Sequence, residues 1–233
     1  MAGPTTSVYI IVVGAGQIGS QVLELATASA NEVVVVERDP EVAEAASQTY
    51  DCLVLNADAT EKETLEDAGA ADADAIICTT DEDATNIMVL LLAKEFEIPS
   101  LVTVVQNPEH MNIFRRVGAT VLENPQRLIA QYLFRAVERP SVEDFMEVGG
   151  DAEIFEVTVS RGSPIAGRTL SDVGDDGLLG TDLLLVAIER DEDTLITPRG
   201  DTDVQAGDVV TVFSRVGMTD DVISIFTGAD DGR

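Results

Sequence analysis

The chain has 233 residues, of which 45% are hydrophobic, and this is enough for one large domain or two small domains with proper cores. No apolar stretch approaches the length that spans a bilayer, and the short, polar start of the chain does not resemble a signal peptide. A net charge of -29 argues against nucleic acid as a partner, because like charges repel.

The acidic residues are spread along the whole chain, whereas lysine occurs only at Lys62 and Lys94. Such a composition indicates a protein made for a high-salt cytoplasm, where salt screens self-repulsion, and an ordinary solvated acidic surface is the alternative. Cys52 and Cys78 form no metal-binding pattern and are expected to be small buried residues in a reducing compartment. The single histidine, His110, is expected on the surface of a helix and not in catalysis.

The first predicted strand, residues 8–13, runs into the motif G-x-G-x-x-G at Gly14, Gly16 and Gly19, and a predicted helix over residues 17–28 follows. In this order the first glycine permits a tight turn and the second lets the backbone approach a pyrophosphate. The third lets helix and strand pack closely. The helix N-terminus then presents unpaired N–H groups to the anion. The stretch therefore predicts a turn that binds a dinucleotide phosphate.

The second predicted strand, residues 33–37, ends in Glu37, eighteen positions after Gly19 (37 − 19). A carboxylate at this distance from the motif accepts hydrogen bonds from a ribose hydroxyl. A glycine-rich turn without a ligand is the alternative interpretation, but the strand, the spacing and the acid together favour a nucleotide site.

Strands and helices continue to alternate, with strands expected at 53–56, 75–78, 101–105 and 120–122 and helices at 40–50, 60–68, 84–95 and 108–117. Short connections of this kind predict an α/β fold, a Rossmann-like doubly wound parallel sheet with ligands at the carboxyl ends of its strands. Thr60 and Glu63 are expected to form a capping box for the third helix. The helix 84–95 is apolar almost all round, so a sheet should cover one side and a partner subunit another.

The carboxyl ends of the predicted strands offer Gly14–Gly19, Glu37–Asp39, Asp58 and Thr79–Asp81. None of these segments supplies the His, Lys or Tyr that a dehydrogenase uses for proton transfer. We therefore predict no catalytic residue and no metal site, and an NAD-dependent oxidoreductase is the alternative.

A predicted helix over residues 125–138 belongs to no β–α–β unit and is a candidate linker or dimerisation helix. Beyond Gly149 and Gly150 the apolar residues alternate with period two, which predicts a small α+β domain. Its expected elements are strands at 153–159, 183–189, 194–196 and 209–214, a short helix capped by Thr169, and a last helix at 218–226. The predicted organisation is a nucleotide-binding domain over 8–124, a crossover or dimerisation helix over 125–141 and a regulatory domain over 145–216.

Several motifs occur in one order along the chain: Ile10–Gly19, Val35–Asp39, Asn56–Thr60, Thr80–Asn86, Gly162–Leu170, Val186–Arg190 and Thr197–Thr202. In this set the chain resembles the TrkA-like regulatory subunits of potassium transport systems, built from a KTN (RCK-type) nucleotide-binding domain and a TrkA-C (RCK-C) domain. The resemblance covers about residues 8–215. It implies a cytoplasmic regulatory subunit that self-associates to a dimer or higher assembly. Such a subunit binds a nucleotide and modulates an integral-membrane potassium transporter at the inner face of the membrane.

The resemblance also implies the nucleotide-binding residues: Gly14, Ala15, Gly16, Gln17, Ile18, Gly19, Glu37, Arg38, Asp58, Thr80 and Asp81. By this resemblance the segment Gly14–Ile18 holds the pyrophosphate and Glu37 holds the adenosine ribose. Asp58 then lies by the adenine, and Thr80 with Asp81 lies on the other side of the cleft.

Two departures from the family bear on the ligand. The family often carries an arginine near the phosphates in the fifth strand, where this chain has Val104, so another group such as Arg38 has to supply that contact or it is missing. Members of the ATP/ADP-responsive type tend to have arginine after the second glycine, whereas this chain has Gln17, like the NAD-associated members. Gln17 and Glu37 favour NAD(H), with ATP/ADP as the alternative ligand. A stand-alone nucleotide sensor without a membrane partner is a further alternative.

Overall fold

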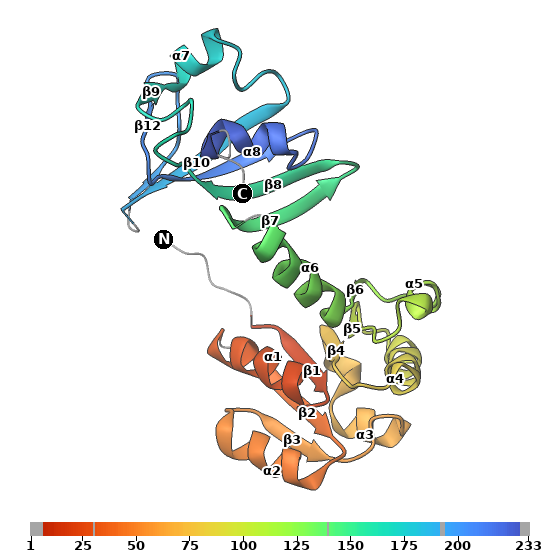
Figure 1. The fold of residues 1–233 in the computed structure, drawn as a ribbon. Coiled ribbons are helices and arrows are strands. Elements are labelled where there is room, and N and C mark those ends of the chain that lie inside the picture. The colour runs from red at the N-terminus through yellow and green to blue at the C-terminus, as the bar shows by residue number, and fades with distance from the viewer. Residues whose placement is uncertain (1–6, 30, 139, 192–193, 229–233) are drawn as a thin grey trace. The chain divides into compact units, whose positions relative to one another are not determined.

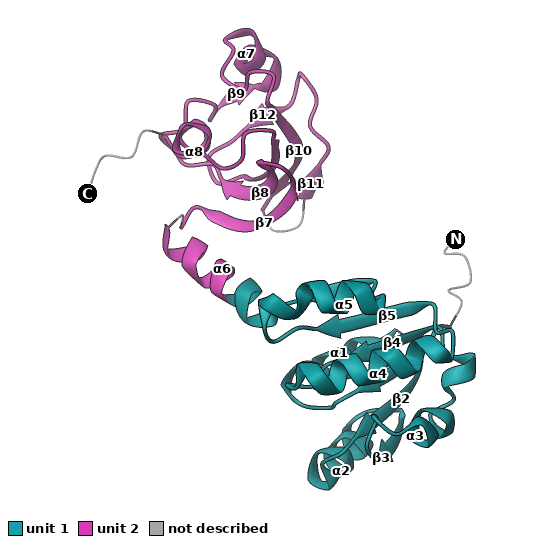
Figure 2. Cartoon of the chain, turned by 90° about the vertical axis from the view of Figure 1, so that its right-hand side faces the viewer, with its two compact units in different colours: residues 1–129 teal, residues 130–233 magenta. Residues whose placement is uncertain are grey.

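The computed structural model of the chain describes residues 7–29, 31–138, 140–191 and 194–228. The first six residues, on which part of the signal-peptide prediction rests, lie outside the described residues. The chain divides into two compact units, residues 1–129 and residues 130–233, which Figure 2 shows in different colours. Each unit has its own sheet and its own core, and each is described by itself below.

The first unit is built on a six-stranded parallel sheet with the strand order β3-β2-β1-β4-β5-β6 (Figure 1). Its strands are β1 (Tyr9–Val13), β2 (Glu32–Glu37), β3 (Leu53–Asn56), β4 (Ala75–Cys78), β5 (Ser100–Val104) and β6 (Val121–Glu123). This order places a topological switch point between β1 and β4, where two successive connections leave in opposite directions. The order and the parallel pairing confirm the predicted Rossmann-like doubly wound sheet.

Helices cover both faces of this sheet: α1 (Gln17–Ala28), α2 (Pro40–Thr49), α3 (Lys62–Asp67), α4 (Asp83–Glu95) and α5 (Met111–Val117). Two short 3-10 turns, Ala70–Asp72 and Pro108–His110, lie between them. On one face Leu23 of α1 packs with Val12 and Val35 of the strands, and on the other Leu90 of α4 packs with Ile11. Both faces are buried, which is why the strands read as continuous apolar runs and not as alternating ones.

The predicted capping box at Thr60 and Glu63 is wrong. The helix α3 begins at Lys62, and its N-cap residue, Glu61, makes no side-chain capping bond. The Thr60 hydroxyl instead donates to Oδ1 of Asp58, two residues back, at 2.7 Å. Thr60 therefore lies one residue before the N-cap, so it is not placed to cap the helix. The other boundaries in this unit match the predictions or differ from them by at most three residues, as helix and strand ends commonly do.

The second unit contains a five-stranded antiparallel sheet with the order β11-β10-β13-β8-β7, and a two-stranded ribbon of β9 and β12. Its elements are β7 (Val142–Gly149), β8 (Ala152–Thr158), β9 (Arg168–Thr169), α7 (Leu170–Asp175), β10 (Leu183–Arg190), β11 (Thr194–Ile196), β12 (Asp203–Val204), β13 (Val209–Ser214) and α8 (Asp220–Thr227). One face of the sheet is covered by a core in which Phe155 of β8 meets Phe226 of α8 edge-on. Strands and helices in this arrangement confirm the predicted α+β class.

Two features of the second unit bear on the sequence predictions. Thr169 is the N-cap of α7, as predicted, because its hydroxyl accepts from the backbone N–H of Asp172. The edge strand β7 was not predicted. Its register against β8 shifts between Val142 and Asp144 and again between Glu147 and Gly149, so its side chains do not alternate with a clean period of two.

One further helix, α6 (Pro125–Glu138), begins in the first unit and ends in the second. In the part of the chain that the structure describes, no helix is both long enough and apolar enough to cross a membrane.

Candidate functional site

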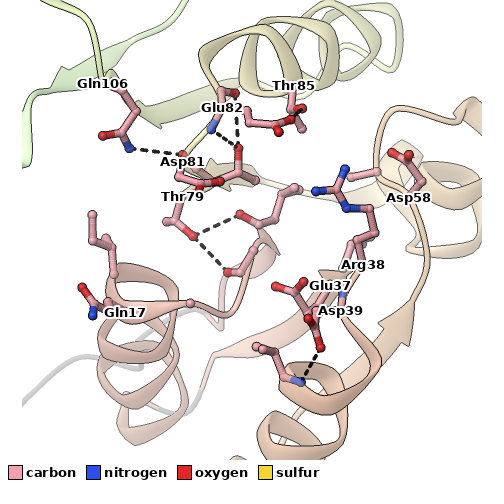
Figure 3. A pocket seen from close by; sticks show the side chains of 18 of the residues that line it. Gln17, Glu37, Arg38, Asp39, Asp58, Thr79, Asp81, Glu82, Thr85 and Gln106 are labelled. Atoms are coloured by element: carbon pink, nitrogen blue, oxygen red, sulfur yellow. Dashed lines mark hydrogen bonds between the residues drawn. The ribbon is translucent and has the colours of Figure 1, made fainter.

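A pocket of about 530 Å³ opens at the carboxyl ends of β1, β2 and β4, at the switch point of the parallel sheet (Figure 3). All but two of the predicted binding residues line it: Gly14, Gly16, Gln17, Ile18, Glu37, Arg38, Asp58, Thr80 and Asp81. The other two, Ala15 and Gly19, lie in the same turn and contribute through the backbone, as described below. The structure thus brings the predicted residues together in one cavity of the size that small-molecule sites have.

The glycine turn between β1 and α1 has a different requirement at each glycine. Gly14 has a φ of 90°, which side chains rarely tolerate. A Cβ atom on Gly19 would lie 2.1 Å from the carbonyl oxygen of Gly14, so helix and strand approach too closely for any side chain there. A Cβ atom on Gly16 would meet nothing within 4 Å, so the space beside it is open to the pocket. These three positions match the three roles of the motif.

The N-terminus of α1 points at the pocket without a side chain to satisfy it. Gly16 is the N-cap residue, it makes no side-chain capping bond, and the first turn of the helix carries no acid. The unpaired N–H groups and the positive end of the helix dipole therefore remain available for an anion such as a pyrophosphate.

Thr79, the residue after β4, fixes the glycine turn from the other side. Its hydroxyl oxygen lies 2.9 Å from the carbonyl oxygen of Gly14 and 3.1 Å from that of Val13, and it donates to this pair of acceptors. The prediction named Thr79 only as part of the loop 79–81. The position of Thr79 at the end of a buried strand indicates a residue at the pocket. Its hydrogen bond to the glycine turn depends on the pairing of β1 with β4, which the sequence does not show directly.

Glu37, at the end of β2, is held by two backbone groups. Its Oε2 accepts from the N–H of Ala15 at 2.7 Å, and its Oε1 accepts from the N–H of Asp39 at 2.7 Å. The carboxylate therefore joins the glycine turn to the start of α2, where Asp39 is the N-cap. A carboxylate has about four acceptor positions, so the side chain retains the capacity to accept from ribose hydroxyls.

Asp58 lies across the β3 end of the pocket. It accepts from the N–H of Thr60 at 2.9 Å and from its hydroxyl, and these bonds, aided by the nearby charge of Arg38, hold the pKa of Asp58 below its ordinary value. Asp58 is therefore ionised at neutral pH. Arg38 is the one cationic side chain among the pocket-lining residues of the described chain.

The opposite side of the pocket is formed by the loops after β4 and β5. The Thr80 hydroxyl lies 2.6 Å from the Asn86 side-chain oxygen, and the Asn86 amide donates back to the Thr80 carbonyl at 3.1 Å. Gln106 and Gln126 also line this side, and sequence reasoning missed both. Gln106 follows a predicted strand and could have been found by that signal, whereas nothing in the sequence places Gln126 at the pocket.

Asp83 and His110 lie behind this wall. Asp83 is 9% exposed and accepts from the N–H groups of Gln106 and Asn107 and from the His110 ring at 2.7 Å. Because a carboxylate can only accept, Nδ1 of His110 donates. Burial opposes ionisation of Asp83, but these hydrogen bonds outweigh it and lower the pKa of the carboxyl. His110, expected on a helix surface, lies in the 3-10 turn before α5 and has this contact with a buried acid.

The groups that line the pocket suit the binding of a polar ligand. None of the lining side chains in the described part of the chain is His, Lys, Cys or Tyr. No cluster of His, Cys, Asp and Glu among the described residues could hold a metal ion. Val104, where the family often has an arginine, is buried and contributes no charge. The groups that face the cavity are backbone N–H groups, carboxylates, hydroxyls, amides and one guanidinium.

Fold and pocket together define a two-unit protein whose first unit is a Rossmann-type domain with a glycine turn for an anion. The sequence pattern of the TrkA-N domain family matches residues 10–125, and that of the TrkA-C domain family matches residues 154–227. The chain therefore belongs to the TrkA-like family, which confirms the resemblance drawn from its motifs.

Two curated relatives of the same family match this chain over nearly the whole length of both proteins. A "Trk system potassium uptake protein TrkA homolog" of Methanothermobacter thermautotrophicus is 29% identical over 221 residues, which are 94% of this chain and 100% of the relative. A protein of the same name from Pyrococcus abyssi is 29% identical over 224 residues, with 93% and 96% covered.

Among solved structures, the GsuK RCK domain is similar with a TM-score of 0.67 at 19% identity, and covers 98% of this chain. The "GsuK channel bound to NAD" is similar with a TM-score of 0.69, also at 19% identity. This chain spans 49% and 41% of those two chains. At such low identity the likeness shows that the fold is shared.

Proposed function

We propose that this chain is a nucleotide-binding regulatory subunit that modulates a membrane potassium-uptake system. The observation that carries the proposal is the pocket at the switch point, with the open side of Gly16, the unsatisfied start of α1 and the carboxylate of Glu37 all facing one cavity. The names of the curated relatives support the potassium-uptake role. Cytoplasmic localisation, with attachment to the membrane through the transporter, is part of the proposal.

The proposed ligand is NAD(H), with ATP or ADP as the alternative. The pyrophosphate binds at the N-terminus of α1, and the adenosine ribose donates its hydroxyls to Glu37. One solved structure of GsuK is bound to NAD and another to ADP. These structures support a nucleotide as the ligand and do not decide between the two. Gln17 favours NAD(H), because an amide offers no charge to a terminal phosphate.

Regulation requires that the nucleotide bind two arrangements of the assembly with different affinity. We place self-association on apolar side chains that the isolated chain leaves exposed. On α4 these are Met88, 46% exposed, and Leu91, 44% exposed, on the side away from the sheet. On α6 they are Leu128, Ile129, Leu133, Phe134 and Val137. Several exposed apolar side chains on one helix are typical of surfaces that a partner copy covers.

A non-enzymatic role follows from the same proposal. A pyridine-nucleotide oxidoreductase is the second candidate, favoured only by the glycine turn and Glu37, which dehydrogenases share. The lining residues in the described chain include no His, Lys or Tyr beside the cavity to transfer a proton. Steady oxidation of NADH with a candidate substrate, followed by absorbance, would favour the enzyme over the sensor.

The test is calorimetric titration of the full chain with NAD+, NADH, ADP and ATP. Glu37→Ala is expected to lower the affinity for the nucleotide about 10- to 100-fold, because charged hydrogen bonds contribute about 1.5–3 kcal/mol to binding. Glu44→Ala is the matched control, because Glu44 is exposed on α2 and its side-chain oxygen accepts from Gln48 outside the pocket. Unchanged binding in Glu37→Ala removes the ribose role, and absence of binding by wild type refutes the nucleotide proposal. Co-purification of the chain with a multi-span potassium transporter tests whether such a transporter is its partner.

A further inference from the structure

The pocket continues past the glycine turn to the carboxyl end of β5, where Gln106 and Gln126 line it. Figure 3 shows Gln106 on the side of the cavity opposite Arg38 and Asp58. With an adenosine ribose at Glu37 and a pyrophosphate in the middle, at the start of α1, the Gln106 side receives whatever extends beyond the pyrophosphate. In a dinucleotide that group is the second nucleoside, and in ATP it is a terminal phosphate.

Gln106 is fixed in place by its own backbone and side chain. Its N–H donates to Oδ1 of Asp83 at 2.8 Å, and its carbonyl accepts from the Asn124 amide at 3.0 Å. Its side-chain Nε2 donates to the Thr80 carbonyl at 3.3 Å. The amide plane of Gln106 is therefore held against the pocket wall before any ligand arrives.

Gln126 meets Gln106 from the first turn of α6. Its Nε2 donates to Oε1 of Gln106 at 2.7 Å, and its own side chain is exposed. Asn124 anchors this turn, since its Oδ1 accepts from the N–H of Arg127 at 2.8 Å while its amide donates to the carbonyls of Val105 and Gln106. A bond between two neutral amides exchanges at little cost for bonds to a ligand amide of the same kind.

The charge on this side of the pocket is unfavourable for a phosphate. Asp81 and Glu82 line it, whereas the guanidinium of Arg38 lies close enough to Asp58 to lower the pKa of that acid. A terminal phosphate beyond the pyrophosphate would face carboxylates and amides without a cation from the lining residues that the structure describes. An uncharged or positively charged ring that carries a carboxamide would suit both the amides and the acids.

We propose that Gln106 and Gln126 form the subsite for the second nucleoside of a dinucleotide, and that Gln126 determines the preference for a dinucleotide over ADP. This inference rests on the proposed nucleotide-binding function. Within the subsite Gln106 is the fixed partner, and Gln126 turns its amide to donate to and accept from the ligand carboxamide. Because Gln126 lies in the first turn of α6, and this helix continues into the second unit from Ala130, occupation of the subsite acts directly on that helix.

The experiment is calorimetric titration of the full chain with NAD+ and with ADP, on wild type, Gln126→Ala and Gln131→Ala. Gln126→Ala is expected to lower the affinity for NAD+ about 5- to 10-fold, because one or two neutral hydrogen bonds are lost. The affinity for ADP is expected to change less than about twofold. Gln131, on the same helix but outside the pocket lining, is the matched control and should leave both affinities unchanged.

The outcomes are distinct. A selective loss for NAD+ in Gln126→Ala supports the subsite. Equal losses for NAD+ and ADP, or no loss for either, overturn it while the nucleotide site itself stands. If wild type binds neither ligand, the proposed function fails first and the subsite fails with it. Unfolding temperatures of the unliganded variants, expected within about 2 °C of wild type, show that an affinity change is not a folding defect.

Discussion

Among the described glycines of the first unit, Gly19 leaves the least room for a side chain, so Gly19→Ala has a clear structural consequence. The added Cβ would lie 2.1 Å from the Gly14 carbonyl oxygen and 2.8 Å from both the Gly14 carbonyl carbon and the Thr79 hydroxyl oxygen. Two of these three atoms are backbone, so no side-chain rotation relieves the clash. Overpacking of a buried site lowers the free energy of unfolding by about 1–3 kcal/mol. Because the backbone of Gly14 cannot move aside, we expect a loss at the upper end of this range. About 3 kcal/mol corresponds to a drop of about 10 °C in unfolding temperature for a unit of this size.

Gly16→Ala is the matched control for that substitution, because it lies in the same turn and adds the same methyl group. Its Cβ would meet nothing within 4 Å, and its φ of -67° is accessible to alanine. We expect its calorimetric unfolding temperature to stay within about 2 °C of wild type, while nucleotide affinity falls because the methyl group occupies the space into which the pyrophosphate must approach. Equal stability of Gly19→Ala and Gly16→Ala would refute the assignment of distinct packing and binding roles to these glycines.

Three further predictions concern stability and reactivity. Asp83→Asn is expected to lower the free energy of unfolding by about 1–3 kcal/mol at neutral pH. Because the folded pKa of Asp83 is lowered, its stabilisation is present above about pH 4 and lost as pH falls further, so urea titrations of wild type and variant should converge in acid. Burial raises the pKa of the Cys78 thiol, so Cys52, only half-buried, should react first with a thiol reagent in native protein, and equal rates would contradict this. With a net charge of -29, unfolding temperature should rise by several degrees between low and molar salt, and full stability at low salt would refute the high-salt adaptation.

The fold of the first unit could be predicted from the sequence because its signals are local. The run of β1, the three glycines and the acid at the end of β2 lie within thirty residues, and each has a steric or electrostatic meaning that does not depend on distant packing. The regular alternation of strands and helices then leaves few alternatives to a doubly wound sheet. Because parallel strands end at one edge, Glu37, Asp58 and Thr80 could be placed together before any coordinates existed.

The features that the sequence did not reveal depend on contacts between distant segments. Gln126 reaches the pocket because Asn124 ties the start of α6 to the carbonyls after β5, and no spacing rule relates those positions. Thr60 and Glu63 have the residue types of a capping box, but α3 begins at Lys62 with Glu61 as its N-cap, one residue too late for Thr60 to cap it. The edge strand β7 lost its periodicity to two register shifts. These features depend on where the helix begins, how the strands pair and which distant segments meet, and a local sequence pattern does not determine them.

The electrostatics of the pocket explain how so acidic a chain can hold an anionic ligand. The carboxylates on the β2–β3 side are satisfied by backbone N–H groups: Glu37 by Ala15 and Asp39, and Asp39 by the first turn of α2. Arg38 is the one cation among the lining residues of the described chain, so phosphate binding depends on the backbone N–H groups at the start of α1. The acceptor positions that remain on these carboxylates suit a ligand that donates hydrogen bonds, as ribose hydroxyls do. A free phosphate offers few such donors, so under the proposed function the same charges would disfavour simple anions and favour nucleosides joined by a pyrophosphate.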